Sequence, residues 1–172
     1  VYYGGLSNPY NVKDVLFLYH QFMPKIWSKF ENAELWLVGS KPSQEVRKLT
    51  QNPRVIVTGF VDDLSDVFKD KHLMVMPWSG ASGFRSRLIE VMALGLPIIT
   101  SKDLVKQMDI KEHDKFLLAE DNQQLSELAL KLLNNKKILM NQSISGRKFV
   151  EQQYSFEATY GALPDYLLKI RK

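Results

Sequence analysis

The chain has 172 residues, 45% of them hydrophobic, which is enough for one compact domain with a sizeable core. Its formal net charge of +4 attracts anionic ligands or acidic membrane surfaces only mildly, because 19 acidic residues offset 23 basic ones. The absence of cysteine excludes disulfides and thiolate metal sites, and no apolar run approaches the roughly 20 residues that a membrane-spanning helix needs. The chain begins at Val1 directly with a strand-like run, so we expect a piece of a longer protein.

Apolar periodicity predicts strands and helices in alternation along the chain. In chain order, we expect a strand at 1–3, a helix over 12–30, a strand at 33–38, a short helix over 44–51, a strand at 55–58, a short helix over 63–69 and a strand at 73–76. A helix over 84–94, a strand at 98–100, an irregular segment, a strand at 116–119 and helices over 125–133, 137–153 and 156–170 follow.

Capping and breaking residues define several of these helices. Asn8 or Asn11 is the expected N-cap of the first helix, and Pro24, which lies inside the helical pattern, is expected to kink it. Asp63 is expected to cap the helix that begins at Leu64. Asp121 caps a later helix, with Gln124 at the capping-box position.

Short strands separated by helices predict an α/β fold, in which a mostly parallel six-stranded sheet is covered on both faces. This is a Rossmann-like three-layer α/β/α domain. In such sheets, ligands bind outside the carboxyl ends of the strands, at the point where the strand order reverses. We therefore expect a binding site at this edge.

The stretch 76–100 has the layout of an anion-binding corner, in which an apolar strand leads through a loop with Gly80 and Gly83 into a helix. Arg85 and Arg87, just inside this helix, add charges suited to phosphate oxygens. Two arginines separated by one residue do not share a helix face, so at most one of them serves this purpose. Arg85 is the stronger candidate because it lies nearer the helix start; otherwise it is a surface arginine.

Several motifs in this order resemble the donor-binding, C-terminal half of a GT-B glycosyltransferase from the large retaining group called group 1 or family 4. They are LVG at 37–39, VTGFVDD at 57–63, MP at 76–77 and GFRSRLIEVMALGLPII at 83–99. The resemblance covers essentially the whole chain. It implies that residues 1–172 are one nucleotide-sugar-binding domain and that the N-terminal acceptor domain lies outside this sequence.

The resemblance also implies roles for individual residues. Glu90 matches the glutamate that accepts hydrogen bonds from the ribose hydroxyls, and 82–84 (Ser82, Gly83 and Phe84) falls where the diphosphate and sugar approach the backbone. Gly39, Phe60 and Val61 lie at strand ends that face the expected crevice, with the nucleotide base near the latter two. Arg85 and Arg87 are the catalytic candidates, because cations stabilise the charge that develops on the leaving diphosphate.

Structural alternatives remain for two of these residues, and one position departs from the family. Glu90 could simply pair with Arg87 one helical turn earlier, and Phe60 could be a core residue. Many family members carry a first glutamate eight positions before the second, where this chain has Ser82. Arg85 and Arg87 match a subset with the same serine, so the usual acidic contact to the donor sugar does not carry over.

The implied activity is transfer of a glycosyl group, with retention, from a UDP- or GDP-linked sugar to a polysaccharide or lipid-linked glycan. The resemblance implies no cofactor and no metal. The expected partners are the donor, the N-terminal GT-B domain, the acceptor and, through peripheral association, the cytoplasmic face of a membrane, with no nucleic acid. The alternative is a non-catalytic Rossmann-like nucleotide-binding or regulatory domain, although no Gly-x-Gly-x-x-Gly follows the first strand.

Overall fold

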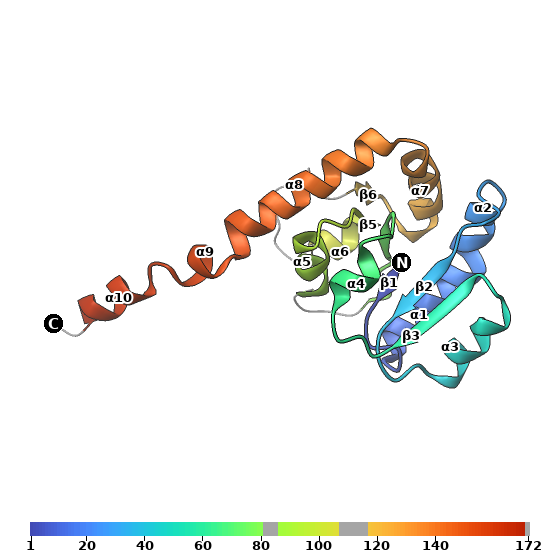
Figure 1. The fold of residues 1–172 in the computed structure, drawn as a ribbon, viewed down its shortest axis with the longest axis horizontal. Helices are drawn as coiled ribbons and strands as arrows, with labels where there is room; N and C mark the ends of the chain where they lie inside the picture. Colours follow the sequence, from blue (N-terminus) through green and yellow to red (C-terminus); the bar gives the residue numbers. More distant parts are fainter. Residues whose placement is uncertain (81–85, 107–116, 171–172) are drawn as a thin grey trace.

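The computed structural model describes residues 1–80, 86–106 and 117–170 of the chain (Figure 1). The strands in this part pair in two parallel ladders, β1-β2-β3 and β4-β5-β6. Their bounds are β1 (Tyr2–Tyr3), β2 (Leu35–Val38), β3 (Val55–Gly59), β4 (Met74–Met76), β5 (Ile98–Ser101) and β6 (Leu117–Ala119). Each predicted strand is therefore confirmed to within two residues at either end.

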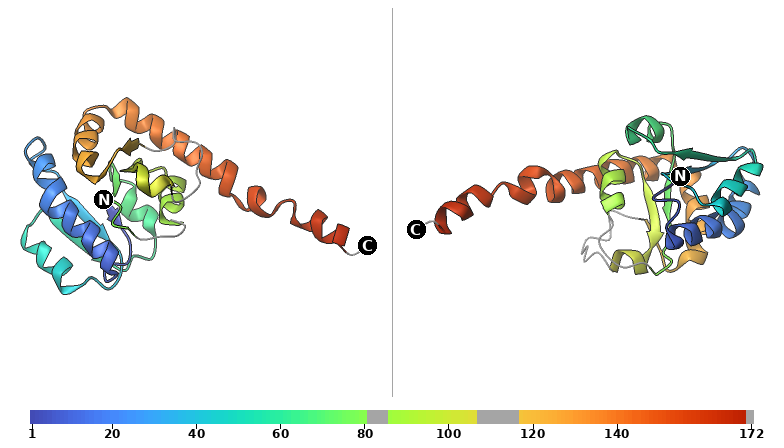
Figure 2. Two further views of the ribbon diagram at one scale, coloured as in Figure 1. Left: turned by 180° about the vertical axis from the view of Figure 1, so that it is seen from behind. Right: turned by 90° about the horizontal axis from the view of Figure 1, so that it is seen from below.

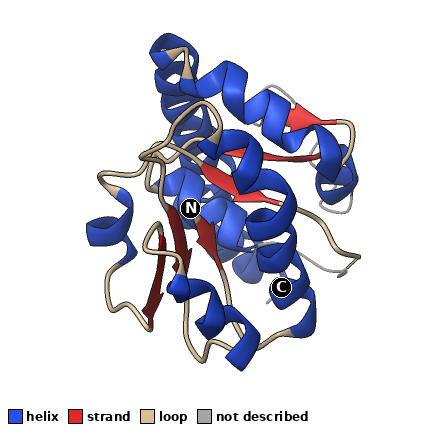
Figure 3. Ribbon diagram, turned by 90° about the vertical axis from the view of Figure 1, so that its right-hand side faces the viewer, coloured by secondary structure: helices blue, strands red, loops and turns tan. Residues whose placement is uncertain are grey.

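The two ladders meet where β1 lies beside β4. The Val1 amine donates to the Leu73 carbonyl at 2.8 Å, and the Val75 N–H donates to the Val1 carbonyl at 2.9 Å. These bonds join the ladders into one sheet of order 3-2-1-4-5-6, whose strands are red in Figure 3. This is the strand order of a doubly wound dinucleotide-binding fold, with its switch point between β1 and β4.

The helices connect successive strands and complete the layers. Within the described residues they are α1 (Pro9–Phe17), η1 (Leu18–Phe22), α2 (Met23–Trp27), α3 (Gln44–Lys48), η2 (Leu49–Gln51), α4 (Leu64–Phe68), α5 (Ser86–Ala93), α6 (Lys102–Lys106), η4 (Asn122–Gln124), α7 (Leu125–Leu133), α8 (Lys136–Tyr154), α9 (Phe156–Tyr160) and α10 (Leu163–Ile170). The α6 helix lies in a segment that the sequence predicted to be irregular.

The core is divided into two layers by the alternation of side chains along each strand. On β4, Val75 packs with α1, η1, α2 and α7, whereas Met74 and Met76 pack with α4, α5, α6 and α8. On β5, Ile99 and Ile98 divide in the same way. Both faces of the sheet are therefore buried under helices, and the predicted three-layer α/β/α architecture is confirmed.

The predicted helix over 12–30 is interrupted by a π-helical turn, η1, directly before Pro24. The Met23 N–H donates to the Leu18 carbonyl, five residues back, instead of to the fourth. A proline ring clashes with the carbonyl four residues before it, so a wider turn at this point accommodates Pro24 without ending the helix. The sequence predicts a kink at Pro24, and the irregularity that the structure shows there is this π-helical turn.

The last predicted helix is divided into α9 and α10, and both extend away from the sheet beyond α8 (Figure 1, Figure 2). α8 itself packs on α5, where the Cβ of a residue replacing Gly146 would lie 3.4 Å from the Met92 side chain. The body that contains the sheet therefore ends at α8.

Asn8 caps α1, because its side-chain oxygen accepts hydrogen bonds from the N–H groups of Tyr10 and Asn11. Asn8→Ala is expected to lower the free energy of unfolding by about 1 kcal/mol, the usual contribution of an N-cap. Urea denaturation followed by circular dichroism measures this change. Lys13→Ala, at an exposed position of the same helix, is the control and should leave the midpoint unchanged; equal losses in both variants would contradict the capping role.

Candidate functional site

A pocket of about 210 Å³ lies beyond the carboxyl ends of β1, β2 and β3, beside the switch point of the sheet. The β1–α1 loop, the ends of β2 and β3, and one side chain of α5 form its walls. The lining residues are Tyr3, Gly4, Gly5, Val38, Gly39, Ser40, Phe60, Val61 and Arg87. This is the edge at which a doubly wound sheet binds its ligands.

The structure brings four of the predicted site residues together, namely Gly39, Phe60, Val61 and Arg87, which all line this pocket. The Phe60 side chain is 75% exposed, so it is not a core residue. Glu90 is not among the lining residues; it lies about one turn beyond Arg87 on α5, where it contacts Tyr3, a residue that does line the pocket. Ser82, Gly83, Phe84 and Arg85 lie outside the described residues, so their predicted roles stay predictions.

Arg87 reaches from α5 to the end of β1. Its Nη1 donates to the Tyr3 carbonyl at 2.5 Å, and its Nη2 donates to Asn11 Oδ1 at 3.3 Å. The guanidinium also lies 5.9 Å from the centre of the Tyr2 ring, within range of a cation–π contact. Because these contacts fix a half-buried cation at the pocket wall, it does not have to be ordered when an anion binds.

Gly4 and Gly39 allow this close approach of the backbone. A Cβ on Gly4 would lie 1.9 Å from Arg87 Nη1, so a larger residue would displace the guanidinium. A Cβ on Gly39 would lie 1.8 Å from the Gly4 carbonyl oxygen, and Gly39 has a φ of 148° that other residues rarely adopt. The Arg87 guanidinium therefore excludes a side chain at Gly4, and the Gly4 carbonyl excludes one at Gly39. Both glycines are required by packing as well as by turn formation.

Glu90 interacts with Tyr3, not with Arg87. The Tyr3 hydroxyl donates to Glu90 Oε2 at 3.2 Å, while no ion pair links Glu90 to Arg87 among the described side chains. Burial raises the pKa of the Tyr3 hydroxyl, and the adjacent Glu90 carboxylate raises it further. The structural alternative for Glu90, a pair with Arg87, is therefore wrong, and Tyr3 is a residue that the sequence reading missed.

Two side chains from distant segments hold the loop that follows β4. Asn122 accepts from the Trp78 N–H at 3.0 Å and donates to the Trp78 carbonyl at 2.9 Å. The Ser79 hydroxyl donates to the buried Asp14 carboxylate at 2.5 Å. Asp14 lies four residues before the buried Leu18, so it is on the inner face of the first helix. A charged residue at a buried helix position needs a partner, and this was the sequence signal that could have predicted the bond between Asp14 and Ser79.

Of the acidic pair after β3, Asp62 and Asp63, the second caps a helix. Asp63 accepts a hydrogen bond from the Ser65 N–H at 2.8 Å, and the bonds from Ser65 lower the pKa of this carboxyl. The predicted cap of α4 is thus confirmed. In the part of the chain that the structure describes, no group of three or more His, Asp or Glu side chains is placed to hold a metal ion.

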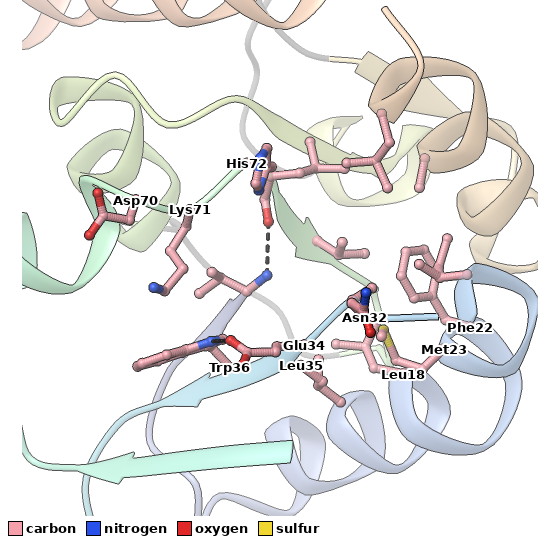
Figure 4. Close-up of a pocket in the computed structure, with 17 residues that line it drawn as sticks. Leu18, Phe22, Met23, Asn32, Glu34, Leu35, Trp36, Asp70, Lys71 and His72 are labelled. Atoms are coloured by element: carbon pink, nitrogen blue, oxygen red, sulfur yellow. Dashed lines mark hydrogen bonds between the residues drawn. The ribbon is translucent and has the colours of Figure 1, made fainter. Parts of the chain in front are cut away.

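A second pocket, of about 250 Å³, lies at the opposite edge of the sheet (Figure 4). Its inner wall is apolar, with Leu18, Phe22 and Met23 from the first helical segment. At its mouth Lys71 lies 3.7 Å from the centre of the Trp36 ring. Because this pocket faces the amino ends of the strands, it is separate from the predicted site.

The strand order and the pocket at the switch point define a doubly wound α/β domain with a cation, Arg87, in the wall of this pocket. A family model described as "Glycosyl transferases group 1" matches residues 1–135. The chain therefore belongs to the group 1 glycosyl transferase family, as the resemblance of its motifs indicated.

Known proteins similar to this chain agree with the family. The capsular polysaccharide biosynthesis glycosyltransferase CapM of Staphylococcus aureus is 27% identical over 147 residues, in an alignment that covers 80% of this chain and 38% of CapM. Anabaena Alr3699/HepE in complex with UDP has a TM-score of 0.74 at 14% identity, over 98% of this chain and 48% of HepE. WaaG, a glycosyltransferase involved in lipopolysaccharide biosynthesis, has a TM-score of 0.57 at 18% identity, over 84% of this chain and 43% of WaaG. The chain thus spans less than half the length of these relatives.

The close approach at Gly39 can be tested against Gly59, because both residues have positive φ but only a Cβ at Gly39 would meet other atoms. Gly59→Ala is expected to cost about 1–2 kcal/mol of stability, the penalty of a left-handed backbone. Gly39→Ala adds a collision with the Gly4 carbonyl, so it should lower the thermal midpoint well below that of Gly59→Ala. Differential scanning calorimetry measures both, and equal midpoints would show that the packing around Gly4 is not limiting.

Proposed function

We propose that this chain is the donor-binding domain of a glycosyltransferase that transfers a sugar from a nucleoside diphosphate sugar to a glycan acceptor. The observation that carries the proposal is the pocket at the switch point, which gathers Gly39, Phe60, Val61 and Arg87, while Glu90 is hydrogen-bonded to Tyr3 in its lining. UDP is the nucleotide we favour, since HepE structures hold UDP, or UDP-glucose, on a similar fold.

Each part of the nucleotide has a chemically matched partner in this proposal. The exposed Phe60 ring stacks on the base, whose edge meets the backbone at Val61. The Glu90 carboxylate accepts hydrogen bonds from the ribose hydroxyls. The Arg87 guanidinium, held by Tyr3 and Asn11, is proposed to bind the diphosphate. The predicted contacts of Ser82, Gly83 and Phe84 with the diphosphate and sugar are part of the same proposal.

The reaction breaks the bond between the sugar C1 and the diphosphate oxygen, and the electron pair leaves with the nucleotide. A cation already in place stabilises this charge more in the transition state than in the bound substrate, so it accelerates the step. Arg87 supplies such a cation in the described part of the chain, and since two arginines so spaced do not share a helix face, Arg85 is the alternative candidate for the same role. We propose that the acceptor hydroxyl oxygen forms the new bond to C1 with retained configuration, that its proton passes to the departing diphosphate, and that no cofactor takes part.

The remaining half of the protein is proposed to be an N-terminal GT-B domain that binds the acceptor, so the chain alone would bind the donor without turnover. The names of CapM and WaaG suggest a capsular polysaccharide or a lipid-linked glycan as the acceptor class. We propose action in the cytoplasm, with peripheral attachment of the whole protein to the membrane. None of the helices in the described segments is long and apolar enough to cross a bilayer.

Glu90→Ala is expected to weaken UDP binding about 10- to 100-fold, because hydrogen bonds to a carboxylate are worth about 1.5–3 kcal/mol. Isothermal titration calorimetry of the full-length protein with UDP measures the change. Glu127→Ala, at an exposed position on α7, is the matched control and should bind like the wild type. Unchanged affinity in Glu90→Ala would refute the ribose contact.

Phe60→Ala is expected to weaken UDP binding about 5- to 100-fold, because stacking on an aromatic ring contributes about 1–3 kcal/mol per base. Since the ring is 75% exposed, its loss should leave the thermal midpoint close to that of the wild type. Phe60→Tyr keeps the stacking surface and serves as the control. Full UDP affinity in Phe60→Ala would place the base elsewhere.

A transfer assay with full-length protein, UDP-glucose and a glycan acceptor separates catalysis from simple binding. We expect release of UDP that depends on the acceptor and is lost in Glu90→Ala. A non-catalytic nucleotide-binding module would bind UDP, yet it would leave every UDP-sugar and GDP-sugar unchanged.

A further inference from the structure

Tyr3, the last residue of β1, is held at three points. Its carbonyl accepts from Arg87 Nη1 at 2.5 Å, and its hydroxyl donates to Glu90 Oε2 at 3.2 Å. Its ring packs edge-on against Phe68, with ring centres 5.9 Å apart and an interplanar angle of 73°. Because both polar partners lie on α5, one residue of β1 contacts the two α5 side chains assigned to the nucleotide.

The hydroxyl contact restricts the Glu90 side chain. Glu90 is exposed on α5, and a free glutamate there would sample several rotamers. The phenol that holds it is rigid, since its ring is fixed between the backbone of β1 and Phe68. Burial and the neighbouring carboxylate raise the pKa of Tyr3, so the hydroxyl keeps its proton and remains the donor.

One carboxylate oxygen is thereby engaged, while the carboxylate as a whole retains further lone pairs for other donors. The 2′ and 3′ hydroxyls of a ribose are two adjacent donors that match these acceptors. Tyr3 also lines the pocket beside Gly39 and Phe60, which puts the same side chain next to the proposed nucleoside position.

We propose that Tyr3 is a positioning residue for ribose recognition: its hydroxyl fixes the Glu90 carboxylate in the orientation that accepts hydrogen bonds from the ribose hydroxyls. This inference rests on the proposed function, because it assigns the nucleotide to this pocket. It adds a selective role, since the hydroxyl of Tyr3 is needed only for ligands that carry ribose hydroxyls.

A purely structural role for the same bond has different consequences. The Tyr3–Glu90 bond also ties β1 to α5, but Arg87 already makes that connection through the Tyr3 carbonyl. If the hydroxyl served only to hold the fold together, its loss would lower the affinity of every ligand in the pocket alike. If it orients Glu90, ligands without ribose hydroxyls should be unaffected.

The test compares UDP with 2′,3′-dideoxyuridine diphosphate in binding to the full-length protein by calorimetry. In Tyr3→Phe, which keeps the ring and removes the hydroxyl, we expect UDP affinity to fall about 3- to 10-fold while the dideoxy ligand binds as to the wild type. Tyr160→Phe, at an exposed tyrosine of α9, is the control and should change neither affinity. In Tyr3→Phe combined with Glu90→Ala, the loss should equal that of Glu90→Ala alone.

Equal losses for both ligands in Tyr3→Phe, or no loss for either, would overturn the role of Tyr3 while leaving the proposed function intact. A further loss in the double variant beyond Glu90→Ala would show that Tyr3 acts independently of Glu90 and would overturn it as well. Failure of the wild type to bind any nucleoside diphosphate or nucleotide sugar would instead overturn the proposed function, and this inference with it.

Discussion

The contact of the Arg87 guanidinium with the Tyr3 carbonyl, across Gly4, is the constraint on which the site depends. The backbone bonds that join β1 to β4 lie at Val1, on the amino side of the sheet. At the carboxyl side the two strands lead into loops that run in opposite directions, since the strand order reverses here. Arg87 spans this divergence, because it belongs to the helix after β4 and binds the end of β1.

This constraint accounts for the small residues around the pocket. The guanidinium occupies the space that a side chain at position 4 would fill, and the Gly4 carbonyl occupies the corresponding space at Gly39. The main chains of β1 and β2 can therefore converge just beyond their paired residues, where the Gly4 N–H donates to the Val38 carbonyl at 2.9 Å. Because the main chains converge here, much of the pocket wall is backbone. Such a wall suits a ligand that is recognised through main-chain contacts and a few charged groups.

The fold could be predicted from the sequence because its determinants are local. Alternating side chains on short strands, caps such as Asn8 and Asp63, and the breaker Pro24 each act within a few residues. α6 was missed because its five residues show too little periodicity to be distinguished from a loop. The sequence predicts one helix over 156–170, where the structure has α9 and α10, because the spacing of apolar residues continues across Gly161.

The site was predictable only in part, because its precise geometry depends on contacts between distant segments. Parallel strands end at the same edge of a sheet, so the topology alone predicts that residues directly after β2 and β3 lie close together. Three of the predicted site residues are of this kind, namely Gly39, Phe60 and Val61. The partners of Glu90 and Arg87 do not follow from topology. On a helix, Glu90 and Arg87 are neighbours by spacing, yet each finds its partner on the other side of the sheet junction, at Tyr3. The pairing of β1 with its neighbouring strands determines where Tyr3 lies relative to α5, and the spacing of residues along the sequence does not predict this.

The loop after β4 illustrates why such long-range contacts matter for a phosphate site. Asp14 of α1, 65 residues before Ser79, accepts a hydrogen bond from the Ser79 hydroxyl. Asn122, which follows β6 and lies 44 residues after Trp78, binds the Trp78 backbone. The loop is thus anchored from both sides of the switch point before it reaches α5. Because Trp78 and Ser79 are fixed in this way, these two residues need no ordering when a ligand binds, which favours the preorganised recognition of an anion that we propose for this edge of the sheet.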